Sequence, residues 1–260
     1  MYRRIVSKYI NGLIKPSSSR VQLCTSTYVD RLDVGSIKWY QRHRFINLYK
    51  TAPANTHCIC IDNSTFDVAS SILTETSILN ETCILNETYY RDYAPRLISV
   101  NKQLGSKRCP SITTLSPNIQ CYSDIEFGEY VHKYRDIDDS MISVAWIDGM
   151  SAFANRGGYK YSTKESLGYL LHSLSHRATV MLVFDYSRKN RHQFLDDILI
   201  DILNVVESGS RVAQHHNDVI NIHGCVRSGI IKSGSSSISY YEYKGRSNGM
   251  FMVGVEFVVV

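Results

Sequence analysis

The chain has no long apolar run, no paired-cysteine motif and no segment with the composition of a signal peptide. No stretch approaches the ~18 consecutive apolar residues that a membrane helix needs, so we expect no membrane association. In the N-terminal segment MYRRIVSKYINGLIKP, the residues Ser7, Lys8 and Asn11 interrupt the apolar positions that a secretion signal keeps continuous. These absences favour an intracellular location, in the cytoplasm or the nucleus.

The seven cysteines stand at irregular spacings, with no Cys-x-x-Cys pair and no accompanying histidine cluster. An odd and irregular set disfavours both a disulfide framework and structural zinc, so we expect no metal. Cys58 and Cys60 alternate within an apolar segment, which is typical of buried thiols in a strand.

Apolar residues make up 43% of the 260-residue chain and charged residues 20%, an ordinary balance for a globular protein. The length suits one α/β domain with a sizeable core and is short for two. We therefore expect a single domain over 1–260, with a leading helix and linker over 1–27 and an α/β core over 28–260.

The net charge is +5, and the basic residues are clustered. Such clusters indicate a polyanionic partner, with ordinary solvated helix faces as the alternative. There are three: Arg3, Arg4 and Lys8; Arg42, His43 and Arg44; Arg188, Lys189, Arg191 and His192.

Hydrophobic periodicity predicts strands that alternate with helices. Strands are expected at 28–34, 57–62, 96–101, near 111, at 140–148 and at 178–185. Helices are expected at 2–15, 37–50, 65–75, 163–175 and 193–206, with Ser162 and Glu165 as a capping box and a surface loop after 75. The alternation predicts an α/β fold with a doubly wound, mostly parallel sheet. The runs SISYYEY and MFMVGVEFVVV, around an Asn-Gly turn signal, predict a C-terminal antiparallel hairpin.

Four aspartates fall at the carboxyl ends of predicted strands: Asp33, Asp62, Asp148 and Asp185. In open α/β sheets, ligands lie outside these ends, at the point where the strand order switches. Asp62 is the best candidate, because an acid after the second strand can accept both ribose hydroxyls of an adenosyl group. Its alternative role is to cap the helix that follows Asn63.

The order of these pieces resembles the mRNA cap (guanine N7) methyltransferases, a family with cellular and large-DNA-virus forms, over most of the chain. Asn11-Gly-Leu-Ile-Lys15 is similar to the family's Asn-Asn-x-Ile-Lys, with the second Asn replaced. Leu32-Asp-Val-Gly-Ser36 resembles the start of its Leu-Asp-x-Gly-x-Gly loop, but it leads straight to Lys38-Trp39, so the glycine loop is shortened. Cys60-Ile-Asp-Asn-Ser64 resembles the end of the family's second strand.

The resemblance implies a Rossmann-like methyltransferase fold, S-adenosylmethionine as cofactor and capped RNA as substrate. It assigns to the cofactor side Asn11, Lys15, Asp33, Gly35, Asp62 and Asp124, with Asp62 on the ribose and Asp124 on the adenine. It assigns to the cap guanine Glu242 and Tyr243, which resemble a Glu-Tyr pair of the family, and Phe153, which would replace the His-Tyr that the fourth strand lacks. Guanine N7 has a free lone pair, so catalysis consists of alignment and no catalytic residue is assigned.

The alternative is an inactive methyltransferase-fold subunit that binds and supports a capping-enzyme partner. The missing glycines and the missing His-Tyr favour this alternative, and the retained Asp62 and Glu242 oppose it. Another nucleotide-binding Rossmann protein is disfavoured, because a terminal hairpin is foreign to the usual dinucleotide plan. Strand alternation also predicts that Tyr241 and Tyr243 share one face of the hairpin and Glu242 the other.

Overall fold

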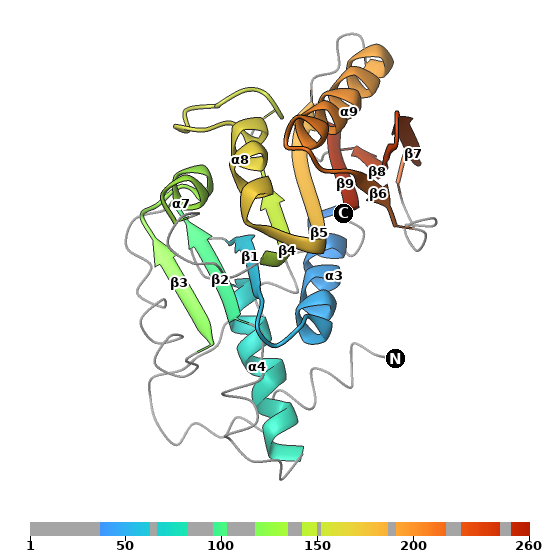
Figure 1. Cartoon of the computed structure of the whole chain (residues 1–260). Helices are drawn as coiled ribbons and strands as arrows, with labels where there is room; N and C mark the ends of the chain where they lie inside the picture. Colours follow the sequence, from blue (N-terminus) through green and yellow to red (C-terminus); the bar gives the residue numbers. More distant parts are fainter. Residues whose placement is uncertain are drawn as a thin grey trace.

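The computed structural model describes residues 37–62, 67–82, 96–102, 118–134, 142–149, 152–186, 191–216, 225–244 and 251–260. Within these ranges strands and helices are interspersed as far as residue 208, and strands alone follow (Figure 1). The elements predicted at 2–15, at 28–34 and near 111 lie outside the described residues. No helix in the described ranges is both long and apolar enough to cross a bilayer.

Five parallel strands form one half of a nine-stranded sheet. Their order across the sheet is β3 (Ile119–Ser123), β2 (Arg96–Asn101), β1 (His57–Ile61), β4 (Ile142–Asp148) and β5 (Leu174–Tyr186). The chain moves outward from β1 to β3 and then returns to β4 on the other side of β1, so the order switches between β1 and β4. This is the predicted doubly wound arrangement. The five strands end at one edge, the carboxyl edge, at the top of Figure 1.

The other half of the sheet is antiparallel. β9 (Phe251–Val259) pairs with β5, β8 (Ser236–Lys244) pairs with β9, and β7 (Arg227–Ser233) pairs with β8 at the sheet margin. The short strand β6 (Ala213–His215) also pairs with β9. The predicted C-terminal hairpin is therefore confirmed, within a larger antiparallel meander that includes two strands we did not predict.

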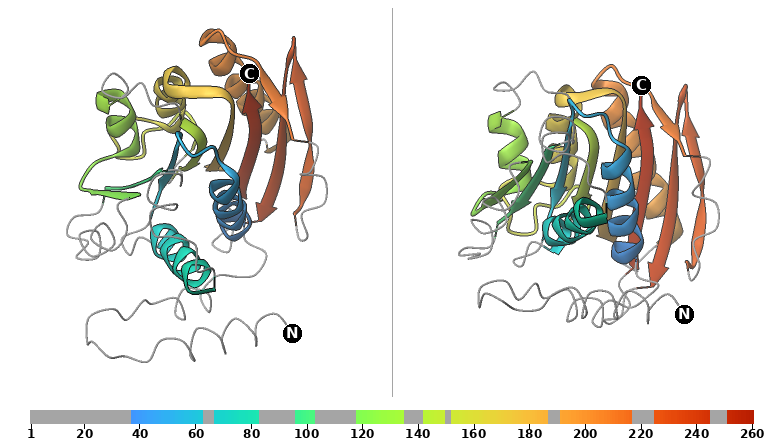
Figure 2. Two further views of the ribbon diagram at one scale, coloured as in Figure 1. Left: turned by 60° about the horizontal axis from the view of Figure 1, so that its bottom comes forward. Right: turned by 90° about the horizontal axis from the view of Figure 1, so that it is seen from below.

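Helices cover both faces of the sheet (Figure 2). One face carries α3 (Ile37–Thr51) and α4 (Asp67–Thr82), and the other carries α7 (Phe127–Tyr134), α8 (Thr163–Leu170) and α9 (Arg191–Ser208). Along β1, Ile59 packs in the α7–α9 core, while Cys58 and Cys60 pack in the α3–α4 core. Burial on both faces explains why this strand is apolar throughout, and it confirms the two thiols as core residues.

Two predicted boundaries are wrong. α4 does not end near 75 but continues to Thr82, because the segment contains no Gly or Pro that would stop it. The capping box of Ser162 and Glu165 is present, but α8 ends at Leu170. A single 3₁₀ turn then leads into β5, which begins at Leu174 because this residue already pairs with Ile142 of β4.

A buried glutamine fixes α3 against the sheet. The Gln41 side chain is fully buried; its Nε2 donates to the carbonyl of Leu182 (3.1 Å) and to the hydroxyl of Tyr241 (2.7 Å). Its Oε1 accepts a hydrogen bond from Nε1 of Trp146 (2.9 Å). Through the side chain of Gln41, α3 is hydrogen-bonded to β4, β5 and β8.

The basic cluster at 42–44 has the same function in the fold. Arg42 is buried and donates through Nη2 to Oγ of Ser71 in α4 (2.8 Å), and Arg44 forms an ion pair with the fully buried Glu256 of β9. The prediction that this cluster meets a polyanion, or simply water, is wrong for both arginines, because they connect α3 to neighbouring elements. The other two clusters lie outside the side chains that the structure describes.

Candidate functional site

Polar residues follow the carboxyl edge from strand to strand. They are Asp124 after β3, Asn101 at the end of β2, Asp62 after β1, Asp148 at the end of β4 and Asp185 near the end of β5. Asp62 and Asp148 flank the switch between β1 and β4, which is where open α/β sheets hold their ligands. Among the described residues, no group of three or more His, Cys, Asp or Glu side chains is placed to hold a metal.

Asp62 caps α4. Both carboxylate oxygens lie near the backbone N–H of Val68 (3.2 and 3.1 Å), and one of them also accepts from the N–H of Ala69 (3.1 Å) and from Oγ of Ser99 (3.0 Å). These N–H groups belong to the first turn of α4, whose early donors have no partner inside the helix. The carboxylate also complements the positive end of the helix dipole. Of the two roles considered for Asp62, this geometry is that of the helix cap.

The sheet order revises the position of Asp62. The sequence interpretation takes it as the acid after the second strand, but among the described strands β1 is central and β2 lies outside it. β2 ends in Asn101, whose Nδ2 donates to the carbonyl of Asp62 (3.0 Å). The position where a dinucleotide-binding sheet places its ribose-binding acid therefore carries an amide. The contact between Asp62 and the ribose of the cofactor stays a prediction.

Ser99 and Asn101 were not identified from the sequence. Both are buried, at 0% and 4% exposure, within the strand RLISVN. A usable signal was present, because buried polar side chains in an apolar strand need hydrogen-bond partners. Ser99 donates to the carboxylate of Asp62, and Asn101 donates to its backbone carbonyl.

Asp124 lies directly after β3, exposed to solvent, with a backbone φ of 67°. Asp is among the few residue types that adopt this left-handed conformation readily, and here it turns the chain from β3 toward α7. The carboxylate is thus at the carboxyl edge, and its predicted contact with adenine stays a prediction.

The three residues assigned to the cap guanine are all buried. Phe153 is 1% exposed and packs in the core against Phe184, with ring centroids 5.6 Å apart. Glu242 is fully buried and accepts a hydrogen bond from the hydroxyl of Tyr186. Tyr243 packs with Tyr241 on the α3 side of β8, while Glu242 faces Tyr186 on the other side, as strand alternation predicts. A guanine role for these residues stays a prediction.

Glu242 and Tyr243 nevertheless lie close to the carboxyl edge. β8 is antiparallel to β9 and β9 to β5, so β8 runs in the same direction as β5. Tyr243 is opposite Met252, which is opposite Asp185, and Glu242 lies one residue earlier. The carboxyl edge thus extends from Asp124 across the whole parallel half to the end of β8.

Four residues assigned to the cofactor lie outside the described residues: Asn11, Lys15, Asp33 and Gly35. The two buried thiols of β1 are poor nucleophiles. Burial raises the pKa of Cys58 to about 12, and it raises the pKa of Cys60 well above its usual value. Since the thiolate is the reactive form, chemistry by these cysteines is disfavoured at neutral pH.

No protein-family model matches the chain, and no curated protein matches it. Solved structures resemble it distantly. Trm5b from Pyrococcus abyssi shares 8% identity with a TM-score of 0.47, covering 85% of this chain and 48% of that one, so the chain spans about half the length of Trm5b. The N-methyltransferase NodS from Bradyrhizobium japonicum, in complex with S-adenosyl-l-homocysteine, shares 11% identity with a TM-score of 0.41 and covers 88% and 90%. Another match, from Streptococcus thermophilus, carries the name hemolysin (14% identity, TM-score 0.45, coverage 87% and 66%).

Proposed function

We propose that the chain is an S-adenosylmethionine-dependent methyltransferase that acts on guanine N7 of an RNA cap. The observation that carries the cofactor part is the occupation of the α4 N-terminus by Asp62. In dinucleotide-binding sheets, the N-terminus of the helix after the central strand receives the pyrophosphate. Here a protein carboxylate takes those N–H groups, so a phosphate at this place would meet negative charge.

The charge of the carboxyl edge agrees with this choice of ligand. Asp148 ends β4 and Asp185 lies one residue before the end of β5, which adds carboxylates to the carboxyl edge on the other side of the switch. S-adenosylmethionine has no phosphate, and its sulfonium and ammonium groups are cations. An acidic edge therefore favours this cofactor over a dinucleotide on electrostatic grounds.

The cap part of the proposal rests on the resemblance of Glu242 and Tyr243 to the family's Glu-Tyr pair and on their place at the carboxyl edge. Because guanine N7 brings its own lone pair, the protein needs only to align the base with the methyl group. The buried Glu242 would accept hydrogen bonds from the guanine once its contact with Tyr186 opens.

Calorimetry with S-adenosylmethionine and, separately, with oxidised nicotinamide dinucleotide tests the cofactor. We expect the first to bind and the second not to bind. Asp148→Asn should weaken S-adenosylmethionine by about 10-fold or more, the effect of losing a charged hydrogen-bond partner. The matched control is Asp197→Asn, the same change at an exposed position of α9. Binding of the dinucleotide alone would overturn the proposal.

Transfer of a labelled methyl group from S-adenosylmethionine to capped RNA tests the substrate. The burial of Glu242 and Phe153 favours a second candidate, the inactive subunit that supports a capping enzyme. Folded protein that neither binds the cofactor nor transfers a methyl group, alone or with a copurifying partner, would make this second candidate the better account.

A further inference from the structure

The described part of the connection between β4 and α8 contains a hydrogen-bonded turn at the carboxyl edge. It reads Asn155-Arg-Gly-Gly-Tyr-Lys-Tyr161, and Gly157 and Gly158 adopt positive φ values of 52° and 88°. Oδ1 of Asn155 accepts from the N–H of Gly157 (3.0 Å), and the N–H of Tyr159 donates to the carbonyl of Arg156 (2.7 Å). Since glycine adopts these conformations without strain, the turn is built into the sequence.

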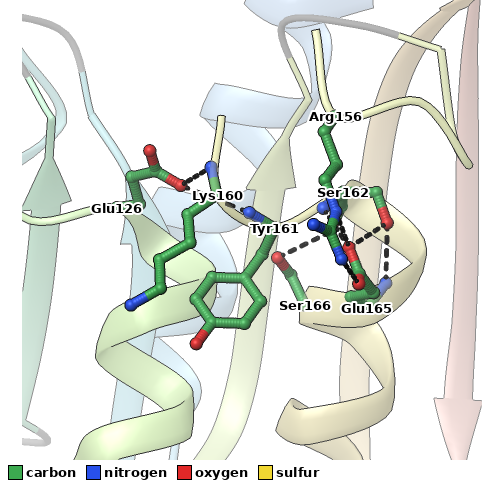
Figure 3. A network of polar contacts seen from close by, with 7 residues as sticks. All are labelled: Glu126, Arg156, Lys160, Tyr161, Ser162, Glu165 and Ser166. Carbon is green, nitrogen blue, oxygen red and sulfur yellow. Dashed lines mark hydrogen bonds and ion pairs between the residues drawn. The ribbon is translucent and has the colours of Figure 1, made fainter. Parts of the chain in front are cut away.

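Glu126 and Glu165 hold the loop by hydrogen bonds and an ion pair (Figure 3), and Glu129 lies near its lysine. Oε2 of Glu126 accepts from the backbone N–H of Lys160 (2.6 Å) and of Tyr161 (3.4 Å), and Oε1 pairs with Nζ of Lys102 (2.7 Å). Glu165, at the start of α8, pairs with Arg156. Glu129 of α7 pairs with Lys133 (2.7 Å) and lies 3.9 Å from Nζ of Lys160.

The cations lie outside these glutamates. The side chains of Lys102, Lys133, Arg156 and Lys160 are 45%, 56%, 60% and 59% exposed, whereas those of Glu126, Glu129 and Glu165 are 12%, 25% and 33% exposed. A partner that approaches this surface therefore meets positive charge first. The carboxylates orient the cations rather than shield them completely.

Aromatic rings alternate with these cations. Nζ of Lys102 lies 4.2 Å from the ring centroid of Tyr159, and Nζ of Lys160 lies 5.5 Å from that of Tyr161. The exposed ring of His132 stacks on Tyr161, with centroids 5.8 Å apart and planes at 23°. Tyr169 meets both of these rings edge-on. The surface thus combines positive charge with π-faces within a few ångströms.

We propose that the loop 155–161, with Lys102 and the exposed end of α7, binds single-stranded RNA. The proposal rests on the proposed function, because it names the surface that would hold the RNA behind the cap. Cations attract the backbone, and rings stack on bases without regard to sequence, which is how sequence-tolerant single-strand binding works. An acidic protein would use the cations but would gain little from the rings. Lys102 directly follows Asn101, so the surface adjoins the candidate site.

Fluorescence anisotropy with an uncapped oligouridine of about 16 nucleotides tests this surface. Tyr159→Leu should weaken binding by about 5- to 150-fold, the range for loss of one stacked base, while Tyr159→Phe should bind as wild type does. Lys160→Ala should lower the magnitude of the slope of log K against log salt by about 0.7. Lys232→Ala removes an exposed charge of the same sign from the margin strand β7 and should leave affinity and slope unchanged.

Calorimetry with S-adenosylmethionine on the same preparations separates the two proposals. A protein that binds the cofactor but not the oligonucleotide overturns the RNA surface and leaves the cofactor proposal intact. RNA binding that Tyr159→Leu and Lys160→Ala leave unchanged places the RNA elsewhere and overturns the surface as well. Displacement of the RNA by polyglutamate, with no effect of Tyr159→Leu, identifies a purely cationic site for acidic protein and also contradicts the proposal.

Discussion

Replacing Asp62 separates its two roles, because capping acts on stability and ligand binding acts on affinity. In Asp62→Ala, the first turn of α4 loses an acceptor for the N–H groups of Val68 and Ala69, which costs about 0.5–2 kcal/mol. The buried hydroxyl of Ser99 also loses the carboxylate to which it donates, at about 1–3 kcal/mol. We therefore expect the free energy of unfolding to fall by roughly 1.5–5 kcal/mol.

Urea unfolding of the protein without ligand gives the stability change. Calorimetry with S-adenosylmethionine, under conditions where the variant is fully folded, gives the affinity. Ser99→Ala is the partial control, since it leaves the helix cap intact and should cost about 1 kcal/mol. The two substitutions should not be additive, because both remove the same hydrogen bond. Asp197→Asn, on the outer side of α9, should stay within about 0.5 kcal/mol of wild type.

The capping argument fails if Asp62→Ala unfolds at the wild-type urea concentration. If the same variant also binds S-adenosylmethionine about 10-fold or more weakly, the carboxylate belongs to the ligand, as the cap-methyltransferase resemblance implies. A destabilised variant with wild-type affinity would assign Asp62 to the fold alone.

Two further predictions concern packing and pH. Gly254→Ala should destabilise the protein by about 1–3 kcal/mol in urea, because its Cβ would lie 2.2 Å from a ring carbon of Tyr241. Hydrogen bonds from Arg156 and from the backbone of Ser162 lower the pKa of Glu165 from 4.5 to about 2. Because this pKa is lower in the folded state, the ionised Glu165 stabilises the fold above pH 4.5, and this stabilisation is lost as the pH falls through about 2. Arg156→Ala should therefore shift the loss of stability to higher pH in acid unfolding.

Gly168 provides the control for the packing prediction. A Cβ at this position in α8 would meet no atom within 4 Å, so Gly168→Ala should be neutral or stabilising by about 0.5–1 kcal/mol. Equal effects of the two substitutions would contradict the steric argument. For the acid limb, a carboxyl titration of Glu165 by NMR that is unchanged in Arg156→Ala would contradict the assigned cause of its low pKa.

Local patterns predicted most of the parallel half. HCICI, RLISVN and ISVAWID are short apolar runs, and each of them forms a strand buried on both faces. The capping box of α8 was predicted from two residues because both hydrogen bonds are local. The C-terminal hairpin followed from its turn signal and its β-rich arms.

The remaining features depend on contacts between distant residues. β7 was missed because it is a margin strand with alternating exposure and contains Gly and Ser, so it lacks an apolar run. The position of Asp62 in the sheet follows from strand order, which periodicity does not contain. The basic residues of α3 were misassigned for the same reason, since their acceptors Ser71 and Glu256 are 29 and 212 residues away.

Glu242 and Glu256, the two buried glutamates described in the antiparallel half, contact different kinds of hydrogen-bond donor. Glu256 lies in mid-strand, opposite Met181 and Ser239, and pairs with Arg44, so it fixes α3 to the sheet. Glu242 lies beside the carboxyl edge and accepts from a neutral donor, the hydroxyl of Tyr186. Glu242 thus joins β8 to β5 beside the edge where ligands of open α/β sheets lie.

Tyr186→Phe tests whether Glu242 serves the fold or a ligand. If the hydrogen bond is structural, its loss should destabilise the protein by about 1–3 kcal/mol in urea and leave methyl transfer to capped RNA unaffected in the folded fraction. If Glu242 binds the guanine, Tyr186→Phe removes a competing hydrogen bond and should preserve or increase the affinity for the cap. Glu242→Gln, which fits the same space, should then abolish cap binding. Cap binding that survives Glu242→Gln would remove Glu242 from the guanine site, and with it the strongest residue-level argument for a cap substrate.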